Sequence, residues 1–463
     1  MVQHPVSEDK RQDGTFRGTQ YCEAGTKEQS GKSGLSPPLE WAGNSRPRRD
    51  TLYPAGERPW LPRPCLPIAN VSTCHNPSVR ILISAGEASG EFYGAELIKA
   101  LRRQVPPGTE LGFFGVGGEQ MRAAGCELLV DAREIAEVGI VEVVKHIPTI
   151  YRRFRQVVRE AERRHPDVAV LIDFPDFNLR LARELHQRGV PVVYYVSPQL
   201  WAWKQGRIER VRKYVNAMLV IFPFEEKFYR ERGIAAKFVG HPLADLPAPT
   251  MTRQQFAREY KLDPARQWIA LLPGSRRAEV ARIFPRLLQA VQLLGPDYVY
   301  TLPVASTLSE EWVASFLRGY HGPPITFTRA ARATLLHARA AAVASGTSTL
   351  EASLIGTPFV MVYSVAPLTW RLGRRLVKVD RFAMVNLIAE RDVVPELVQA
   401  DFTPQKLCQE LRKILADGPA RTAMMGGFRD VRKRLEPAEA GGNASDRAAQ
   451  AVLRMAEGRG FTG

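Results

Sequence analysis

The feature that most limits the fold of this chain is a strand–turn–helix unit near residue 80. The apolar run Ile81–Ile83 is typical of a buried strand, and residues 95–101 carry apolar side chains at helical spacing. The turn between them is rich in small residues that let a ligand approach the backbone: Gly86, Ser89, Gly90 and Gly94. It is neither a P-loop nor a G-x-G-x-x-G turn. Two interpretations therefore remain: a ligand-binding turn, or an ordinary first turn of an open α/β sheet.

This alternation of strand and helix repeats along the chain. The pattern predicts two α/β units of similar size, separated by a Pro-rich linker after His241. Their predicted strands are Ile81–Ile83, Leu111–Phe114, Val168–Ile172, Val192–Val196, Met218–Ile221, Lys237–Val239, Trp268–Leu272, Tyr298–Leu302, Ile325–Thr328, Ala341–Ala344 and Phe359–Tyr363. We therefore expect an α/β fold of two facing Rossmann-like domains, residues 79–243 and 244–463, with a site in the cleft between them.

The first 78 residues have a different composition. They are rich in Gly, Ser, Pro, Arg and Gln and show no sustained apolar periodicity. Such a segment cannot bury enough apolar surface to fold, so residues 1–78 are predicted to be a disordered extension. An over-long gene start explains it as well as a functional tail does.

Charge and cysteine content restrict the class of protein. The net charge of +16 suits nucleic acid, an anionic membrane surface or phosphorylated substrates. The five cysteines and eight histidines show no metal-ligand spacing, so we expect no metal site and free thiols in a reducing cytoplasm. No apolar run is long enough to cross a membrane, and the N-terminus lacks a secretory signal.

A pair of carboxylates follows one predicted strand directly. Asp173 and Asp176 come after Val168–Ile172, at the strand end where catalytic groups of open α/β folds are placed. A carboxylate there can act as a general base toward a sugar hydroxyl. We assign the chemistry to Asp173 and a capping or positioning role to Asp176, with helix capping as the alternative for either.

Two turns of the second unit are suited to a nucleotide diphosphate. Pro273-Gly-Ser-Arg-Arg277 connects a strand to a helix, where free N–H groups and the guanidinium of Arg276 suit a pyrophosphate. Gly346 and Thr347 open another helix, and Glu351, one turn later, could accept from ribose hydroxyls. The chain has no Walker or D-x-D motif, so we expect binding without a metal or other cofactor.

Two further patterns leave alternatives open. From Gly139 to Arg155, apolar residues at helical spacing alternate with basic ones, which is typical either of core packing or of a basic amphipathic membrane surface. Trp201 and Trp203 could line a sugar or acyl groove, or belong to the core. His241 is interpreted as a hinge residue rather than a catalyst.

With these residues taken together, the chain resembles the lipid-A-disaccharide synthase family over about residues 79–457. Several motifs occur in order and at the family's spacing: Gly86–Gly90, Gly139–Val143, Ile172–Asn178, Tyr195–Trp203, Leu271–Arg276, Ala344–Thr347, Arg375–Lys378 and Asn386–Ala389. The resemblance implies an inverting GT-B glycosyltransferase. It would join UDP-2,3-diacylglucosamine to 2,3-diacylglucosamine 1-phosphate, releasing UDP, in lipid A biosynthesis of a Gram-negative bacterium.

The resemblance also assigns residues. The family's proposed base falls on Asp173 and its pyrophosphate-binding arginine on Arg276. Glu87 and Asn386 match polar residues of its active cleft, and we assign Glu87 as a second catalytic residue and Asn386 as substrate-binding. The family's nucleotide side falls on Ser345, Gly346, Thr347 and Glu351, and we add Ser89 and Asp176 as substrate-binding residues. Its membrane-contacting patch falls on Val141, Val143, Val144, Ile147 and Ile150, which implies a cytoplasmic enzyme held peripherally at the inner membrane and leaves a homodimer open.

This sequence departs from the family pattern at two places. Glu91 stands where the family commonly has Asp, and Arg381–Val385 stands where a Leu-Pro more often precedes the Asn. Two other functions are weighed against the synthase. One is a UDP-GlcNAc 2-epimerase-like enzyme with a soluble substrate, which would have no need of the amphipathic segment. The other is a nucleic-acid binder, which the scattered charge and the lack of a binding motif disfavour, so no nucleic acid is expected as a partner.

Overall fold

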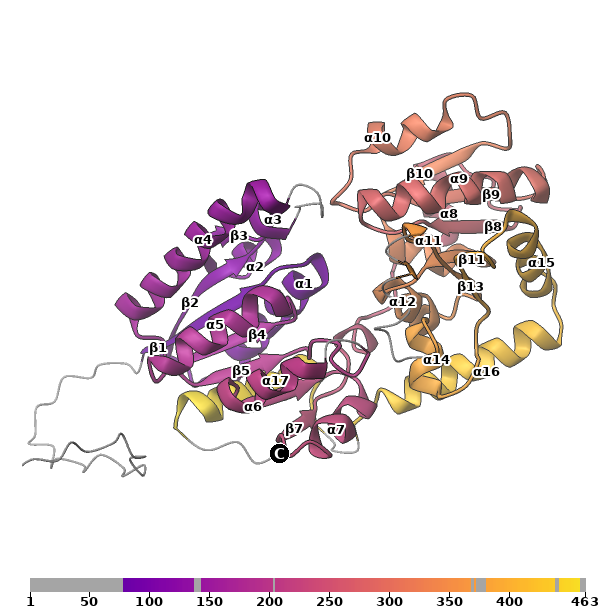
Figure 1. Ribbon diagram of the computed structural model, residues 1–463. Helices are drawn as coiled ribbons and strands as arrows, with labels where there is room; N and C mark the ends of the chain where they lie inside the picture. Colours follow the sequence, from indigo (N-terminus) through magenta and orange to yellow (C-terminus); the bar gives the residue numbers. More distant parts are fainter. Residues whose placement is uncertain are drawn as a thin grey trace, which may run out of the picture. The chain divides into compact units, whose positions relative to one another are not determined.

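The computed structural model describes residues 78–136, 143–202, 205–367, 370–371, 380–437 and 441–458. The predicted extension, residues 1–78, lies outside the described residues except for Ser78, which begins the first strand. The described elements form two parallel sheets with their helices (Figure 1).

The first sheet is seven-stranded and built around β1. Its strands are β1 (Ser78–Ala85), β2 (Glu110–Gly117), β3 (Cys126–Asp131), β4 (Val168–Ile172), β5 (Val192–Tyr195), β6 (Ala217–Val220) and β7 (Ala236–Phe238). They are ordered β3-β2-β1-β4-β5-β6-β7, and every pair is parallel. The helices of this part are α1 (Ala88–Gln104), α2 (Glu119–Ala123), α3 (Arg133–Ala136), α4 (Val143–Arg164), α5 (Pro175–Gln187), α6 (Ile208–Tyr214) and α7 (Pro223–Arg230), with the short 3-10 turns η1 (Gln205–Arg207) and η2 (Pro242–Ala244).

Side chains of each central strand alternate between two cores. Leu82 and Leu171 belong to the core shared with α4 and α5, whereas Ile81 and Ile83 belong to the core on the other face, shared with α1. This alternation is the period-2 geometry of a strand that is covered on both faces. It explains why these strands read as unbroken apolar runs in the sequence.

The second sheet repeats the arrangement with six strands. Its strands are β8 (Trp268–Leu272), β9 (Val299–Pro303), β10 (Ile325–Thr328), β11 (Ala340–Ala344), β12 (Phe359–Tyr363) and β13 (Glu396–Val398). They are ordered β10-β9-β8-β11-β12-β13, again all parallel. The helices described after residue 250 are α8 (Arg253–Tyr260), α9 (Arg277–Leu294), α10 (Glu310–Ala314), α11 (Ala331–His337), α12 (Thr347–Ile355), α14 (Met384–Ala389), α15 (Pro404–Leu415), α16 (Pro419–Arg434) and α17 (Ala444–Ala456), and the 3-10 turn η3 (Ser315–Leu317) is described among them.

The last helix, α17, packs against the first sheet. It contacts α1, β4 and β5, and its Ala448 and Val452 are fully buried. Arg103 Nη2 of α1 lies 2.6 Å from Asp446 Oδ1, and Gln104 Nε2 donates to the carbonyl of Asp446 at 2.7 Å. The division at residues 243 and 244 stays a prediction, and α17, which lies beyond it in the sequence, packs against the first sheet.

All the predicted strands are present, with ends that differ by a few residues. The sequence pattern does not predict β3, at an edge of the first sheet, or β13, at an edge of the second. β13 has only three residues, and β3 begins Cys126-Glu127 and alternates between buried and partly exposed positions. Neither therefore gives the continuous apolar run by which the central strands were recognised.

Each sheet reverses its strand order at one point, where ligands of open α/β sheets bind. In the first sheet the reversal lies between β1 and β4, and in the second between β8 and β11. The four loops that leave these strands contain Glu87, Asp173, Arg276 and Gly346. The strand order thus explains why predicted residues from distant parts of the sequence share the two reversal points.

Candidate active site

Asp173 lies at the end of β4 in a backbone conformation that few residues adopt. Its φ is +44°, and Phe174 follows with φ +50° at the N-terminus of α5. Left-handed residues other than glycine cost free energy and persist where the surroundings hold them. Here the carbonyl of Asp173 accepts from Tyr194 Oη at 2.6 Å and from Asn178 Nδ2 at 2.8 Å.

Asn178 joins the two loops at the reversal point of the first sheet. Its buried amide donates to the carbonyls of Ser84 and Ile172 at 3.2 and 3.1 Å, and its Oδ1 accepts from Ser84 Oγ at 2.7 Å. One side chain thereby connects the ends of β1 and β4. Asn178 closes the Ile172–Asn178 motif, but the sequence alone predicts no role for it.

Gly86 allows the loop after β1 to pass beneath the ring of Phe174. A Cβ atom at this position would lie 2.3 Å from two ring carbons, so no larger residue fits unless the ring moves. The ring also stacks on Phe177 at a centroid distance of 5.4 Å. The glycine is therefore required for the packing of this turn.

The carboxyl group of Asp173 is partly buried, and its pKa is raised from 3.8 to about 7. Burial is the largest cause, and the carboxylate of Glu87 is the second. A hydrogen bond from the backbone of Phe174 and the charge of Arg276 oppose the rise. A carboxyl with a pKa near neutrality can take a proton from a substrate and release it again.

Glu87 and Arg276 form an ion pair between the loops that follow β1 and β8. Arg276 Nη2 lies 3.0 Å from Glu87 Oε2, and Arg276 Nη1 lies 3.4 Å from Glu279 Oε1. The Arg276 side chain is 65% exposed, so it is accessible to an anion from solution. This ion pair brings two predicted site residues together that are 189 positions apart in the sequence.

The turn after β11 presents the N-terminus of α12. Gly346 has φ +142°, a conformation that favours glycine. A Cβ atom at this position would meet open space, so the backbone conformation and not crowding accounts for the glycine. Thr347 begins the helix and is exposed, and Ser345 Oγ donates to the carbonyl of Phe382 at 3.0 Å. Glu351 follows one turn later, and burial raises its pKa.

Asn386 lies in α14, and its amide is fully used within the protein. Nδ2 donates to the Val394 carbonyl and to Glu396 Oε1 at 2.9 and 2.8 Å, and Oδ1 accepts from the backbone N–H groups of Val393 and Val394. The residue is 1% exposed. In this structure the four hydrogen bonds of the amide are all made within the protein, and the substrate-binding role predicted for Asn386 stays a prediction.

Glu396 was not recognised in the sequence, although it supports the same region. Its carboxylate accepts from the N–H groups of Phe382 and Ala383 at 2.8 and 2.9 Å, in addition to Asn386. Since Ser345 donates to the Phe382 carbonyl, these bonds link the α14 N-terminus to the turn after β11. No local motif predicts the link, because its partners come from three separate segments.

The remaining polar predictions have simpler surroundings. Asp176 lies in the first turn of α5, is 67% exposed and pairs with Arg207. Ser89 is partly exposed in the first turn of α1. Glu91 accepts from the backbone N–H of Gln120 at 2.6 Å, so the departure from the family pattern stabilises the start of α2.

Trp201 and His241 belong to an aromatic cluster in the first part. Trp201 Nε1 donates to buried Glu225 at 3.1 Å, and burial raises the pKa of Glu225 to about 8. His241 is 2% exposed, accepts from the Leu243 N–H at 3.1 Å, and burial lowers its pKa to about 3. With its pKa lowered in this way, the imidazole is a weak proton acceptor. Trp203 lies outside the described residues.

The predicted membrane patch is only partly described. Val141 lies outside the described residues, and of the side chains of Val143 and Val144, in the first turn of α4, nothing is described. Ile147 is 52% exposed, whereas Ile150 is partly buried against the core. Among the residues that the structure describes, no helix is long and apolar enough to cross a membrane.

Metal ligands were not expected from the sequence. Within the described ranges, no group of three or more His, Cys, Asp or Glu side chains is arranged to hold a metal ion. At the reversal point of the second sheet, Arg276 and the N-termini of α9 and α12 supply positive charge.

Comparison with solved structures agrees with the fold. The chain is similar to the *S. aureus* MnaA–UDP co-structure (TM-score 0.57, 11% identity, 82% of this chain and 97% of that chain). It is also similar to the spinosyn forosaminyltransferase SpnP (TM-score 0.51, 14% identity, 82% and 99%). A UDP-N-acetylglucosamine 2-epimerase matches at 9% identity with a TM-score of 0.52. Identities this low show the fold alone, which is the predicted GT-B architecture.

Comparison of sequences is more specific. The chain is 57% identical to lipid-A-disaccharide synthase of *Koribacter versatilis* over 380 residues, which cover 82% of this chain and 99% of that relative. It is 50% identical to the synthase of *Acidobacterium capsulatum* over 368 residues, 77% and 91% of the two chains. A family model described as Lipid-A-disaccharide synthetase matches residues 81–452. The epimerase-like alternative is therefore not favoured, and the chain belongs to the lipid-A-disaccharide synthase family, the glycosyltransferases of lipid A biosynthesis.

Proposed function

We propose that the chain transfers 2,3-diacylglucosamine from UDP to the 6-hydroxyl group of 2,3-diacylglucosamine 1-phosphate, with Asp173 as the general base. The acceptor oxygen forms a bond to the anomeric carbon of the donor as the bond from that carbon to the UDP oxygen breaks. The hydroxyl proton passes to Asp173. Attack from the opposite face inverts the anomeric centre and gives a β-1,6 linkage and UDP.

The observation that carries this proposal is the environment of Asp173. With a pKa of about 7, a substantial fraction of the Asp173 side chains is ionised at neutral pH and can accept a proton. The protonated form can also release that proton at the same pH. The strained backbone at Asp173 is held by Tyr194 and Asn178, which is the rigid support that a catalytic group needs. Both features are explained by a base at this position.

Stabilisation of the leaving UDP is assigned to the second sheet. Arg276, with its exposed guanidinium, and the N–H groups of Gly346 and Thr347 would bind the pyrophosphate, whose negative charge grows as the bond breaks. Glu351 would accept from ribose hydroxyls. Arg276 pairs with Glu87 in the structure, so the pyrophosphate would compete with Glu87 for this guanidinium.

The experiment is a thin-layer assay with radiolabelled acceptor and its UDP-linked partner in detergent. Wild type should form the disaccharide, and Asp173→Asn should lose roughly 10²- to 10⁴-fold in kcat, the usual contribution of a general base. Asp297→Asn, which removes an exposed carboxylate from the second part, is the matched control. Turnover by Asp173→Asn at the wild-type rate would exclude Asp173 as the base.

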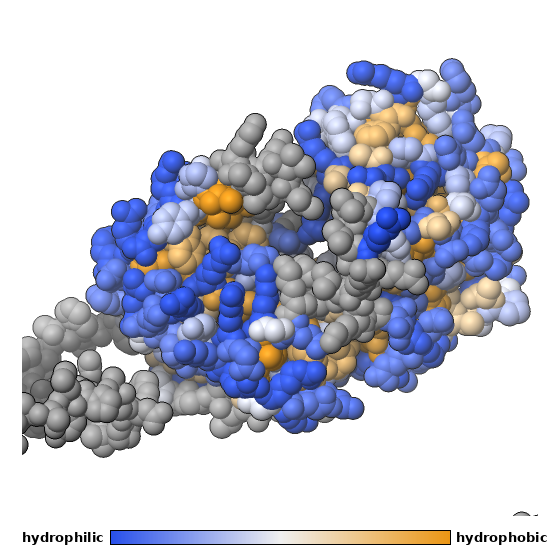
Figure 2. Space-filling view, in the orientation of Figure 1, coloured by the Kyte–Doolittle hydropathy of each residue, from blue (hydrophilic) through white to orange (hydrophobic). Residues whose placement is uncertain are grey.

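Peripheral membrane binding is proposed for α4. Ile147, Tyr151 and Arg155 follow one another at intervals of four residues, so they share one face, and all three are exposed. Ile150 and Val157 face the core instead. Figure 2 shows apolar surface on the part of the molecule where Figure 1 draws α4. Apolar and basic groups on one helix face suit reversible binding to an anionic bilayer.

Flotation with vesicles tests the membrane proposal. The double variant Ile147→Ser/Tyr151→Ser should bind phosphatidylglycerol vesicles more weakly than wild type and keep its activity in detergent. Leu293→Ser removes a comparably exposed apolar side chain, 48% exposed, from α9 and serves as the control. Equal flotation of the double variant and the control would exclude this face as the contact.

A further inference from the structure

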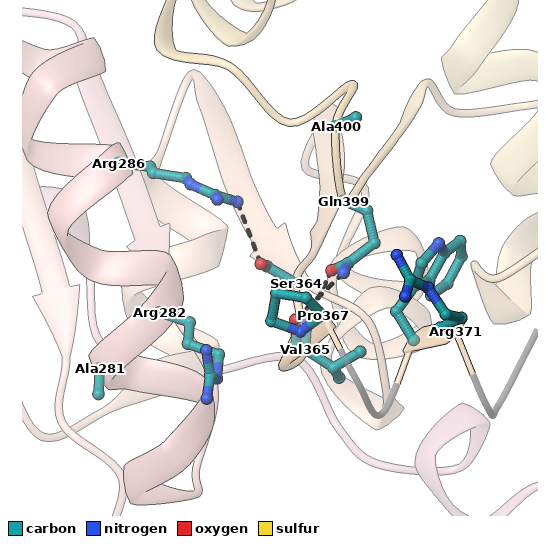
Figure 3. Close-up of a pocket in the computed structure, with 10 residues that line it drawn as sticks. Ala281, Arg282, Arg286, Ser364, Val365, Pro367, Arg371, Gln399 and Ala400 are labelled. Carbon is teal, nitrogen blue, oxygen red and sulfur yellow. Dashed lines mark hydrogen bonds between the residues drawn. The ribbon is translucent and has the colours of Figure 1, made fainter.

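A pocket of about 990 Å³ lies in the second part, beside α9. Figure 3 shows Arg282 and Arg286 of α9 on one side and Arg371 on the other. Between them lie the segment that follows β12 and Gln399, which directly follows β13. None of the predicted site residues lines it. A volume near 1,000 Å³ is large enough for a drug-sized ligand.

The charged side chains among the pocket's lining residues are all positive. Three of its ten lining residues are arginines and none is a carboxylate. Arg286 Nη1 donates to Ser364 Oγ at 3.0 Å and its guanidinium lies over the ring of Phe402, and neither contact neutralises its charge. Across the ranges that the structure describes, none of the three arginines is paired with an acidic side chain. Such a cluster attracts anions.

One stretch of the pocket wall is apolar. Val365, Pro367 and Trp370 line it, and Gln399 fixes Val365 through a pair of hydrogen bonds of 2.7 and 3.1 Å. A ligand that suits this wall as well as the arginines carries an anionic group and an apolar or sugar portion. Guanidinium groups bind carboxylate and phosphate oxygens alike in a two-pronged geometry, and a phosphate, which has more acceptor oxygens than a carboxylate, can contact more than one of the arginines at once.

We propose that this pocket binds the phosphate group of a phosphate ester that also carries acyl chains. Two sources have that chemistry: the acceptor of the reaction, an identification that rests on the proposed function, and a phospholipid of the bilayer. Arg282 and Arg286 follow Glu279 on one face of α9, the helix whose N-terminus carries Arg276. Trp370 packs on Phe382 at 5.9 Å, and Ser345 donates to the Phe382 carbonyl. The pocket thus borders the proposed nucleotide site without sharing its residues.

Direct binding tests the pocket without relying on turnover. Full-length protein should bind octyl phosphate in a calorimetric titration, and the uncharged octyl glucoside should bind no better to wild type than to the variants. Arg282→Gln should weaken octyl phosphate binding by about tenfold or more, as expected for a lost charge-assisted contact. Excess UDP should leave this binding unchanged. Arg258→Gln, an exposed arginine of α8, is the control.

Arg286→Lys covers the case in which loss of the Ser364 contact disturbs folding, because it keeps a positive charge and should retain part of the affinity. If Arg282→Gln and the control bind octyl phosphate equally, the proposal is overturned. If UDP displaces octyl phosphate, the ligand occupies the nucleotide site and the proposal is also overturned.

Two further measurements separate the sources. A rise in KM for the diacylated acceptor in Arg282→Gln, with KM for the UDP-linked donor unchanged, would identify the acceptor phosphate. Weaker flotation with phosphatidylglycerol vesicles and an unchanged acceptor KM would identify a bilayer phosphate. If wild type forms no disaccharide but binds octyl phosphate through Arg282, the proposed function fails while the pocket proposal stands.

Discussion

Replacing Asp173 by Asn should change activity and stability in opposite directions. The pKa of Asp173 is raised from 3.8 to about 7 in the folded protein, so the folded state holds a proton that the unfolded state has already released. An acid with a raised folded pKa makes the protein less stable as pH rises between the two values. The wild type therefore loses stability from pH 3.8 to about 7, and Asn, which is never ionised, does not.

The magnitude follows from the difference between the two pKa values. A difference of about 3, at about 1.36 kcal/mol per unit, corresponds to an upper limit of about 4 kcal/mol above pH 7. Asp173 is partly exposed, and solvent lowers this figure, so we expect about 2 kcal/mol. Asn also tolerates the left-handed backbone at this position better than most residues, so the turn itself should persist.

Urea unfolding of wild type and Asp173→Asn at pH 5, 6, 7 and 8 checks this reasoning. The advantage of the variant in free energy of unfolding should grow from pH 5 to pH 7 and then level off, while its turnover stays far below that of wild type. An advantage that is the same at pH 5 and pH 8 would refute the raised pKa. A variant that is both inactive and less stable at every pH would point to a structural role instead.

Three other changes test the surroundings of the site. Glu87→Gln should move the acidic limb of the kcat/KM–pH profile to lower pH than in wild type, because Glu87 raises the pKa of Asp173. Arg276→Gln should move it to higher pH, because Arg276 lowers that pKa. Shifts of both variants in the same direction would contradict this reasoning. Gly86→Ala should reduce the free energy of unfolding by about 1–3 kcal/mol through overpacking, measured by urea titration, and an unchanged midpoint would count against the packing. Glu225→Gln should gain stability relative to wild type between pH 5 and 8, since burial raises the pKa of this carboxyl, and thermal unfolding at both pH values checks the sign.

Much of the fold could be predicted because local pattern and one topological rule were enough. Asp173 and Arg276 each follow a strong apolar run, and groups at the ends of parallel strands are where ligands bind. The supporting residues could not be found in this way. Tyr194 and Glu396 act through hydrogen bonds to backbone groups of other segments, and a sequence pattern contains no information on such partners.

The α4 segment shows a different limit. Its spacing allowed either core packing or an exposed apolar face, and the structure contains both, since Ile150 packs on the core and Ile147 is exposed. Periodicity identifies the helix, but which apolar positions are buried depends on the neighbours of the helix. Asn386 was assigned to substrate from the resemblance alone, and its burial and four internal hydrogen bonds became visible only in three dimensions.

The position of α17 affects how this protein can be divided. A fragment that ends at the linker after His241 would lack α17 and would leave the α1 surface that packs against α17 exposed to water. It would also leave Arg103 without Asp446. The complementary fragment would carry α17 with an apolar stripe and no sheet to cover it. Neither half is therefore a self-contained folding unit, and an exchange of lobes between related enzymes would have to transfer the C-terminal helix together with the first half of the chain.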